Sequence, residues 1–264
     1  MPRANRHYLP GNIWHLTHRC HKKEFLLKFG RDREEWISWL FEARKRYGLS
    51  VLNYMVTSNH IHLMTTDDGE RETIPKSLQL VAGRVGQQYN QRKKRKGAYW
   101  EDRYHATAIE SGEHLRRCMN YIDMNMVRAG VVDHPGEWPW CGYKEIQNPK
   151  KRHSVINYER LIELFGAKDL IRLQEGRRGS IEEVLRCKEL ARDSRWTESI
   201  AVGGEEFVSR VKEELGVKAK GRKQYGEEDQ YELREEAEGY LVNFGVKNGH
   251  LRPKNAHYLD LSAE

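Results

Sequence analysis

The chain has 264 residues, of which 38% are hydrophobic and 32% charged, with a formal net charge of +7 and a pI near 9.1. No apolar run approaches the roughly 20 residues that span a bilayer, and the N-terminus lacks the apolar stretch of a signal peptide. The four cysteines form no C-x-x-C pair, which argues against a zinc knuckle or a disulfide framework. We therefore expect a soluble cytoplasmic protein whose basic charge favours a polyanionic partner.

Strand and helix patterns alternate through the first half of the chain. They predict, in chain order, a strand over 13–20, a helix over 33–47, a strand or hairpin over 51–66, a helix from about Thr73, a strand over 104–109 and a helix over 111–129. Ser58-Asn59 is a candidate break inside the long strand, and Ser111 is a candidate N-cap. This order predicts an α+β protein with a mainly antiparallel sheet and helices on one face.

The second half of the chain has a different character. A first domain over 1–146 closes around the tryptophan-rich EWPWCGY, and a mainly helical C-terminal region over 147–264 follows. That region shows no convincing strand pattern. Its expected amphipathic helices cover 158–165, 180–192, 205–215 and 227–242.

The stretch TSNHIHLMTT, residues 57–66, carries two histidines two positions apart. On a strand such residues face the same side, so His60 and His62 project together while Ile61 points away. Their Cα atoms would be roughly 6.5 Å apart, and two neutral imidazoles at that spacing can bind one divalent ion. Taken alone the pair is weak evidence and fits two solvated histidines better than a metal site, so a second feature is needed.

That feature lies on the helix expected over 111–129. Tyr121 and Asn125 are four apart and are neighbours on one helix face, at the border of the apolar stripe that packs on the sheet. Arg128 shares the same border. A tyrosine in this position also fits an ordinary core-edge residue with its hydroxyl in water.

Together these residues suggest phosphoryl transfer. His60, His62 and the amide oxygen of Asn125 could hold Mg²⁺ or Mn²⁺, of which manganese suits imidazole better. Tyr121 would be the nucleophile, although a free tyrosine, with a pKa of about 10, needs activation by a nearby base or charge. A covalent phosphotyrosine conserves the energy of the phosphodiester, which suits the rejoining of a strand.

The segments HIHLM, DRYHATAI and YIDMNMVRAGVV, together with PGNIWHLTHRC and EWPWCGY, resemble the single-tyrosine HUH transposases of the IS200-like group. The likeness is closest to the REP-associated tyrosine transposases, and it spans roughly residues 8–145. It implies a ferredoxin-like sheet and an endonuclease and strand transferase that acts on hairpin-bearing single-stranded DNA. The products it implies are a 5′-phosphotyrosine and a free 3′-OH, formed without ATP.

The resemblance also assigns roles to individual residues. It implies that His60 and His62 are the metal ligands, that Tyr121 is the catalytic tyrosine and that Asn125 is the third ligand. Met126 departs from the family pattern, because relatives usually carry proline there.

Binding of single-stranded DNA needs positive charge and aromatic platforms on which bases stack. The residues expected to contact DNA are Arg84, Arg92, Lys93, Lys94, Arg95, Lys96, Tyr99, Trp100, Arg103 and Arg128. The C-terminal region is a further candidate for DNA recognition through its basic tracts Arg177-Arg178 and 218–223. The acidic segment after these tracts favours a regulatory cover over the active-site domain instead.

Two other functions stay open at this level. A non-cleaving DNA-binding regulator would keep the same fold, and a metal-dependent hydrolase would use water in place of a tyrosine. Tyr54, Tyr89 and Tyr104 are rival nucleophiles by residue type alone. Both a monomer and a homodimer fit the sequence.

Overall fold

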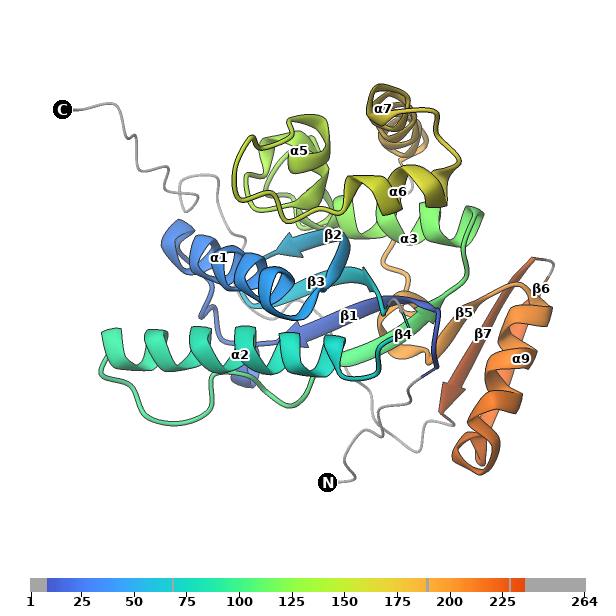
Figure 1. Ribbon diagram of the computed structural model, residues 1–264, viewed down its shortest axis with the longest axis horizontal. Coiled ribbons are helices and arrows are strands. Elements are labelled where there is room, and N and C mark those ends of the chain that lie inside the picture. Colours follow the sequence, from blue (N-terminus) through green and yellow to red (C-terminus); the bar gives the residue numbers. More distant parts are fainter. Residues whose placement is uncertain (1–8, 68, 189, 228, 236–264) are drawn as a thin grey trace.

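The computed structural model describes residues 9–67, 69–188, 190–227 and 229–235. This part of the chain forms a seven-stranded sheet in the order β2-β3-β1-β4-β5-β7-β6 (Figure 1). Its strands are β1 (Ile13–Arg19), β2 (Ser50–Val56), β3 (His60–Thr66), β4 (His105–Ile109), β5 (Ala201–Gly203), β6 (Arg222–Glu227) and β7 (Gln230–Glu235). Neighbouring strands are antiparallel except for β4 and β5, which pair in parallel. The predicted α+β class with a mainly antiparallel sheet is confirmed.

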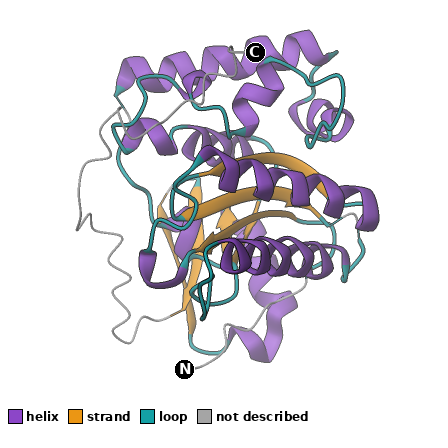
Figure 2. Cartoon of the chain, turned by 90° about the vertical axis from the view of Figure 1, so that its left-hand side faces the viewer, coloured by secondary structure: helices purple, strands orange, loops and turns teal. Residues whose placement is uncertain are grey.

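Helices surround this sheet (Figure 2). The α-helices are α1 (Gly30–Tyr47), α2 (Thr73–Arg92), α3 (Glu113–Asp123), α4 (Asn125–Arg128), α5 (Gly142–Gln147), α6 (Tyr158–Phe165), α7 (Leu170–Cys187), α8 (Arg195–Glu198) and α9 (Glu205–Leu215). Short 3₁₀ turns are η1 (His21–Lys23), η2 (Pro135–Glu137) and η3 (Gly216–Ala219). Within the described ranges, no helix is both long enough and apolar enough to cross a membrane.

The alternation of side chains in β1 assigns these helices to the two faces of the sheet. His18 stacks on Trp100, whose indole N–H donates to the carbonyl of Ala82 in α2, so α2 covers the face of His18. His15 is on the other face, and there it meets the ring of Tyr121 in α3. The expectation of helices on one face is therefore corrected to helices on both, because α3 packs opposite α2.

The long strand expected over 51–66 is a hairpin that turns at Ser58-Asn59, as the sequence suggested. Thr57 closes the turn: its backbone N–H donates to the carbonyl of His60 (3.0 Å), and its hydroxyl accepts from the backbone N–H of Asn59 (3.3 Å) and of His60 (3.1 Å). Such a short hydrogen-bonded turn fixes the register of both strands. The register places His60 and His62 opposite Arg19 and Thr17 of β1.

The helix expected over 111–129 differs in two details. Gly112, with φ 76°, is the N-cap rather than Ser111, and no side chain caps this end. The helix is also interrupted at Met124, where ψ is 2°, so that α3 ends at Asp123 and α4 begins at Asn125. The guanidinium of Arg128 donates to the carbonyl of Tyr121 (2.6 Å) and so satisfies an acceptor in the last turn of α3.

The C-terminal region contains strands that periodicity did not predict. The helices over 158–165 and 205–215 are confirmed, and α7 begins ten residues before the expected 180. The helix expected over 227–242 is wrong for its described part, which forms the end of β6 and β7, whereas 236–242 lie outside the described residues. Leu233 is fully buried between more exposed neighbours, and a single buried residue among many glutamates gives no strand pattern in the sequence. Because β5 pairs with β4, one sheet runs across the boundary expected at 146.

Gly142 marks a point of close approach between α5 and the edge strand β2. A Cβ at Gly142 would lie 2.1 Å from Oδ1 of Asn53 and 2.8 Å from the backbone nitrogen of Tyr54. We expect Gly142→Ala to lower the free energy of unfolding by about 1–3 kcal/mol through overpacking. Urea unfolding followed by circular dichroism would measure it.

Gly176 in α7 provides the matched control, because a Cβ there meets nothing within 4 Å. Gly176→Ala should raise stability by about 0.5–1 kcal/mol, since alanine loses less backbone entropy in a helix. Equal effects of the two substitutions would contradict the close packing described at Gly142.

Candidate active site

Three histidines meet on the face of the sheet that α3 covers. The rings of His60 and His62 on β3 have centroids 5.0 Å apart, and His15 on β1 stacks on His62 at 5.1 Å. Nε2 of His15 lies 2.9 Å from Nδ1 of His62, and Nδ1 of His15 lies 2.7 Å from the carbonyl oxygen of Trp196 in α8. Sequence reasoning did not single out His15. Its position on the same strand face as Thr17 was visible, but the pairing of β1 with β3 was not.

The helices α3 and α4 bring the other two predicted residues to the same place. The ring of Tyr121 is edge-on to His62 at 6.0 Å and lies 6.4 Å from Trp196. The side-chain amide nitrogen of Asn125 is 3.0 Å from Nε2 of His62. The guanidinium carbon of Arg128 lies 4.2 Å from the centre of the Tyr121 ring. The tyrosine, the asparagine and both predicted histidines therefore share one site.

Burial sets the protonation of the histidines. The pKa of His15 is lowered to about 4, mainly by burial, and that of His60 to about 3, mainly by burial with contributions from the cations of Arg19 and Arg128. The pKa of His62 is also lowered well below its ordinary value, first by burial and then by the neighbouring histidines. All three imidazoles are thus neutral near pH 7, the form that binds metals.

Tyr121 responds to burial in the opposite direction. Only 9% of the residue is exposed, and burial raises the pKa of its hydroxyl, while the positive charges of Arg128 and Arg192 act to lower it. The raised pKa keeps the phenol protonated near pH 7. This agrees with the expectation that a tyrosine nucleophile here needs activation.

The donor atoms fit a divalent ion that accepts nitrogen. Nδ1 of His60 lies 2.7 Å from Oδ1 of Asn59 and Nδ1 of His62 is held by His15, which leaves Nε2 of each ring for a ligand. A half-turn of the Asn125 amide exchanges its nitrogen and oxygen and would present the oxygen on the same side. Over the described residues, no group of three or more His, Cys, Asp or Glu side chains is arranged to hold a metal, so the candidate set is two imidazoles and one amide.

The basic segment after α2 borders this site. The backbone N–H of Glu101 donates to the carbonyl of Arg19 (2.9 Å), and Arg19 is the β1 partner of His60. Nε2 of His18 lies 2.7 Å from the carbonyl oxygen of Asp102. The predicted DNA-contacting loop therefore runs along the end of the sheet where the histidine pair begins.

The predicted DNA-contacting residues divide by their exposure. Arg84, Lys93, Lys94, Lys96 and Arg103 are exposed. Arg92 is tied to the buried carboxylate of Asp32, Arg95 pairs with Glu24 at 3.4 Å, and Arg128 lies against Tyr121 rather than on the loop.

The two aromatic residues proposed as stacking platforms are less accessible. Tyr99 is 4% exposed and its hydroxyl donates to the carbonyl of Leu26, so it belongs to the core and offers no face to a base. Trp100 is half-buried, with one face covered by His18. The expectation for Tyr99 is corrected, because helical neighbours that the local sequence does not reveal cover its ring.

An exposed aromatic residue stands nearby instead. Phe29 is 47% exposed, and the ammonium groups of Lys28 and Lys93 lie 5.7 and 5.5 Å from its ring centre. The sequence signal was Lys28 followed by Phe29 just before α1. The prediction of DNA-contacting residues did not include it, because it considered the basic 92–103 loop.

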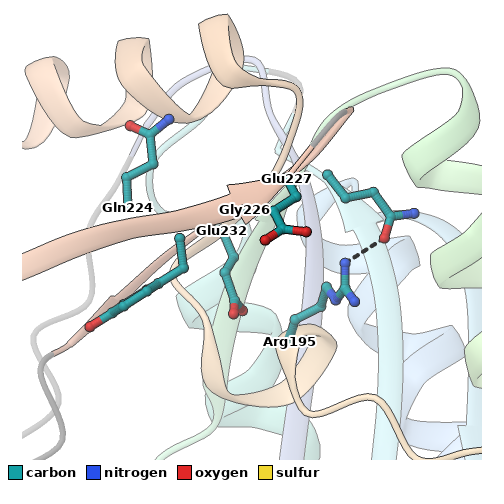
Figure 3. Close-up of a pocket in the computed structure, with 7 residues that line it drawn as sticks. Arg195, Gln224, Gly226, Glu227 and Glu232 are labelled. Atoms are coloured by element: carbon teal, nitrogen blue, oxygen red, sulfur yellow. Dashed lines mark hydrogen bonds between the residues drawn. The ribbon is translucent and has the colours of Figure 1, made fainter.

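The C-terminal part of the sheet carries a separate hollow, lined by Arg195, Gln224, Tyr225, Gly226, Glu227, Gln230 and Glu232 (Figure 3). The guanidinium of Arg195 donates to the side-chain oxygen of Gln230 across it (2.5 Å). None of the lining residues belongs to the histidine and tyrosine site, and the hollow mixes charges of both signs.

Comparison with known proteins adds to this geometry. Residues 11–125 match the family described as "Transposase IS200 like". A solved REP-associated tyrosine transposase bound to a REP hairpin is 17% identical with a TM-score of 0.45, over 58% of this chain and 90% of that one. A candidate transposase of Deinococcus radiodurans R1 is 16% identical with a TM-score of 0.32, over 44% of this chain and 90% of that one. No curated protein matches the sequence.

The family match covers fewer than half of the 264 residues, and the matched segment is similar to the IS200-like transposases, the family that its motifs resemble. The matched region ends at Asn125, so Arg128 and the whole of α8 lie outside it.

Proposed function

We propose that the protein is a metal-dependent endonuclease and strand transferase that cuts hairpin-bearing single-stranded DNA through Tyr121. The observation that carries this proposal is the convergence of His60, His62 and Asn125 beside a single tyrosine ring. The family match supports the same class of reaction. The formal charge of +7 and the exposed Lys93, Lys94, Lys96 and Arg103 along the 92–103 loop favour a polyanionic substrate.

In the proposed reaction the Tyr121 oxygen attacks a backbone phosphorus. A bond forms between that oxygen and phosphorus, and the bond from phosphorus to the 3′-oxygen breaks. The tyrosine loses its proton, the departing 3′-oxygen gains one, and a 5′-phosphotyrosine remains. A divalent ion held by His60, His62 and Asn125 would polarise a phosphoryl oxygen and offset the charge that develops there. Attack by a 3′-OH on the phosphotyrosine reverses these steps, so strands are rejoined without ATP.

Arg128 has a specific part in this scheme. Its guanidinium lies over the Tyr121 ring and donates to the backbone carbonyl of the same residue, which holds the side chain next to the histidines. Its positive charge favours the phenolate over the phenol. The rival Tyr54 lacks such support, because its hydroxyl donates to the buried carboxylate of Glu145 and its pKa is raised well above the ordinary value.

Metal removal tests the proposal. The protein is incubated with labelled single-stranded hairpin DNA and Mn²⁺, and covalent protein–DNA adducts are resolved on denaturing gels. We expect an adduct that EDTA abolishes and that His60→Ala lowers by at least about 100-fold, because one imidazole ligand is lost. His153→Ala, which changes an exposed histidine, serves as the control and should leave the adduct yield unchanged. An adduct of equal yield in EDTA would overturn the metal-dependent reaction.

Phe29 provides a test of the DNA-contacting surface. Its exposed ring, with Lys28 and Lys93 above it, matches the combination of stacking face and positive charge that single strands require. We expect Phe29→Ala to weaken single-stranded DNA binding by about fivefold or more, since base stacking contributes about 1–3 kcal/mol. Fluorescence anisotropy with a labelled oligonucleotide measures this.

Phe25 is the matched control, as it is 41% exposed near the same helix but has no lysine over its ring among the described contacts. Phe25→Ala should change affinity less than twofold. If both substitutions weaken binding equally, the effect comes from general loss of packing rather than from stacking at Phe29.

A further inference from the structure

We infer that His15 is a positioning residue, which takes its orientation from the backbone of α8 and fixes the tautomer of the metal ligand His62. The inference rests on the proposed function, because it concerns how the metal-binding nitrogen is presented. It also gives the C-terminal region a role in the active site. The part of the chain that matches the transposase family ends at Asn125, whereas α8 covers Arg195–Glu198.

The hydrogen-bond partners determine which ring nitrogen of His15 and of His62 is the donor and which is the acceptor. The carbonyl oxygen of Trp196 can only accept, so Nδ1 of His15, 2.7 Å away, must carry the proton. A neutral imidazole has one N–H, and Nε2 of His15 is therefore an acceptor. Nδ1 of His62, 2.9 Å from it, must then be the donor. This leaves the lone pair of His62 on Nε2, the atom that faces Asn125.

Burial leaves this arrangement little freedom. His15 is fully buried, and 2% of His62 and 4% of Trp196 are exposed, so water does not compete for these nitrogens. The stacked rings of His15 and His62 are nearly parallel, with an interplanar angle of 11°. A ring rotation of His15 would break both hydrogen bonds at once and leave buried polar atoms without partners.

The α8 segment is itself anchored to the sheet. Its C-cap, Ser199, receives two hydrogen bonds at its carbonyl oxygen, from the hydroxyl of Thr107 (2.7 Å) and from Nε2 of His105 (2.9 Å), both on β4. These bonds hold the carbonyl of Trp196 over His15, while its indole ring lies beside Tyr121. One short helix thus orients the ligand side of the site and packs against the nucleophile.

A second ligand shows the same pattern by independent means. The amide nitrogen of Asn59 donates to the carbonyl of Lys23 (3.4 Å), so its Oδ1 is the atom 2.7 Å from Nδ1 of His60, and the proton of His60 is also on Nδ1. Histidines that bind metals commonly donate their other N–H to a carbonyl or carboxylate, which fixes ring orientation and tautomer. For His60 the acceptor is a local amide, and for His62 it is His15 with the α8 carbonyl behind it.

The first measurement needs no substitution. In the full chain labelled with ¹⁵N-histidine, long-range ¹H–¹⁵N correlation spectra at pH 7.5 without metal report which nitrogen of each ring is protonated. We expect His62 and His15 both to carry the proton on Nδ1. A proton on Nε2 of His62 would overturn the inference, whether or not the protein binds metal.

The second measurement compares two variants of His15. Glutamine retains a donor for the Trp196 carbonyl and an acceptor for His62, whereas leucine removes both. We expect His15→Leu to weaken Mn²⁺ binding by about 10–100-fold by calorimetry and His15→Gln to stay within a few fold of the parent. Equal affinity of His15→Leu and the parent would overturn the positioning role. A parent protein without Mn²⁺ affinity would refute the proposed metal site, while the tautomer spectrum would still decide the inference.

Discussion

Replacement of Tyr121 by phenylalanine is expected to abolish the covalent adduct and lower DNA cleavage by about 10³-fold or more, because the attacking oxygen is removed. The fold should be unaffected, since the ring contacts with His62, Trp196 and Arg128 do not use the hydroxyl. Single-stranded DNA affinity should stay within about twofold of the parent protein. Denaturing gels with end-labelled hairpin DNA and Mn²⁺ give the cleavage and adduct yields together.

The controls of this experiment separate the competing functions. Tyr54→Phe also removes a buried hydroxyl, the one bound to Glu145, and it should leave the adduct intact. Cleavage that survives in Tyr121→Phe without any adduct would mean that water is the nucleophile. Binding without cleavage in the parent protein, over a panel of hairpins, would favour a regulator that retains the fold.

Replacement of Arg177 by methionine is expected to lower the free energy of unfolding by about 3–5 kcal/mol, because a buried carboxylate loses its partner. Arg177 in α7 and Asp123 at the end of α3 are 2.5 Å apart and almost fully buried, with side chains 1% and 0% exposed. Asp123 also accepts from the side-chain amide of Asn53 (2.9 Å). Urea unfolding monitored by tryptophan fluorescence measures the loss.

Arg178 is the matched control for this effect. It follows Arg177 in the same helix but is exposed, so Arg178→Met should change stability by less than about 0.5 kcal/mol. The double variant Arg177→Met with Asp123→Asn should recover part of the loss, because the unpaired buried charge is gone. If Arg177→Met costs no more than Arg178→Met, the ion pair does not hold α7 on α3.

This ion pair also corrects the expectation that Arg177-Arg178 forms a basic tract for DNA. Charge by itself predicts that both arginines are exposed to solvent, and Arg178 is exposed. Arg177 instead faces Asp123, an acidic residue 54 positions away that the sequence placed two after Tyr121 and on the side away from it. Because Arg177 and Asp123 are far apart in sequence, their ion pair could not be predicted from local charge patterns.

The local periodicity of apolar residues was sufficient to predict many of the strands and helices. The strand at 13–20, the turn at Ser58-Asn59, and the helices at 158–165 and 205–215 follow from patterns within a few residues, because alternation and helical spacing report which side chains share a face. It was insufficient for β6 and β7, whose glutamates gave a helical appearance. Their strand form depends on tertiary pairing: β6 pairs with β7, and β7 pairs with β5, which joins the first half of the sheet through β4.

The features of the candidate site likewise fall into those that the sequence determines and those that only the tertiary structure decides. The sequence by itself determined that His60 and His62 share a strand face and that Tyr121 and Asn125 are neighbours along a helix, because backbone geometry fixes both spacings. Only the tertiary structure decided that the two pairs meet, that Tyr99 lies in the core, and that the carbonyl of Trp196 reaches His15. Those outcomes depend on strand register and on helix packing between residues 63 to 181 positions apart, and no local pattern encodes such contacts.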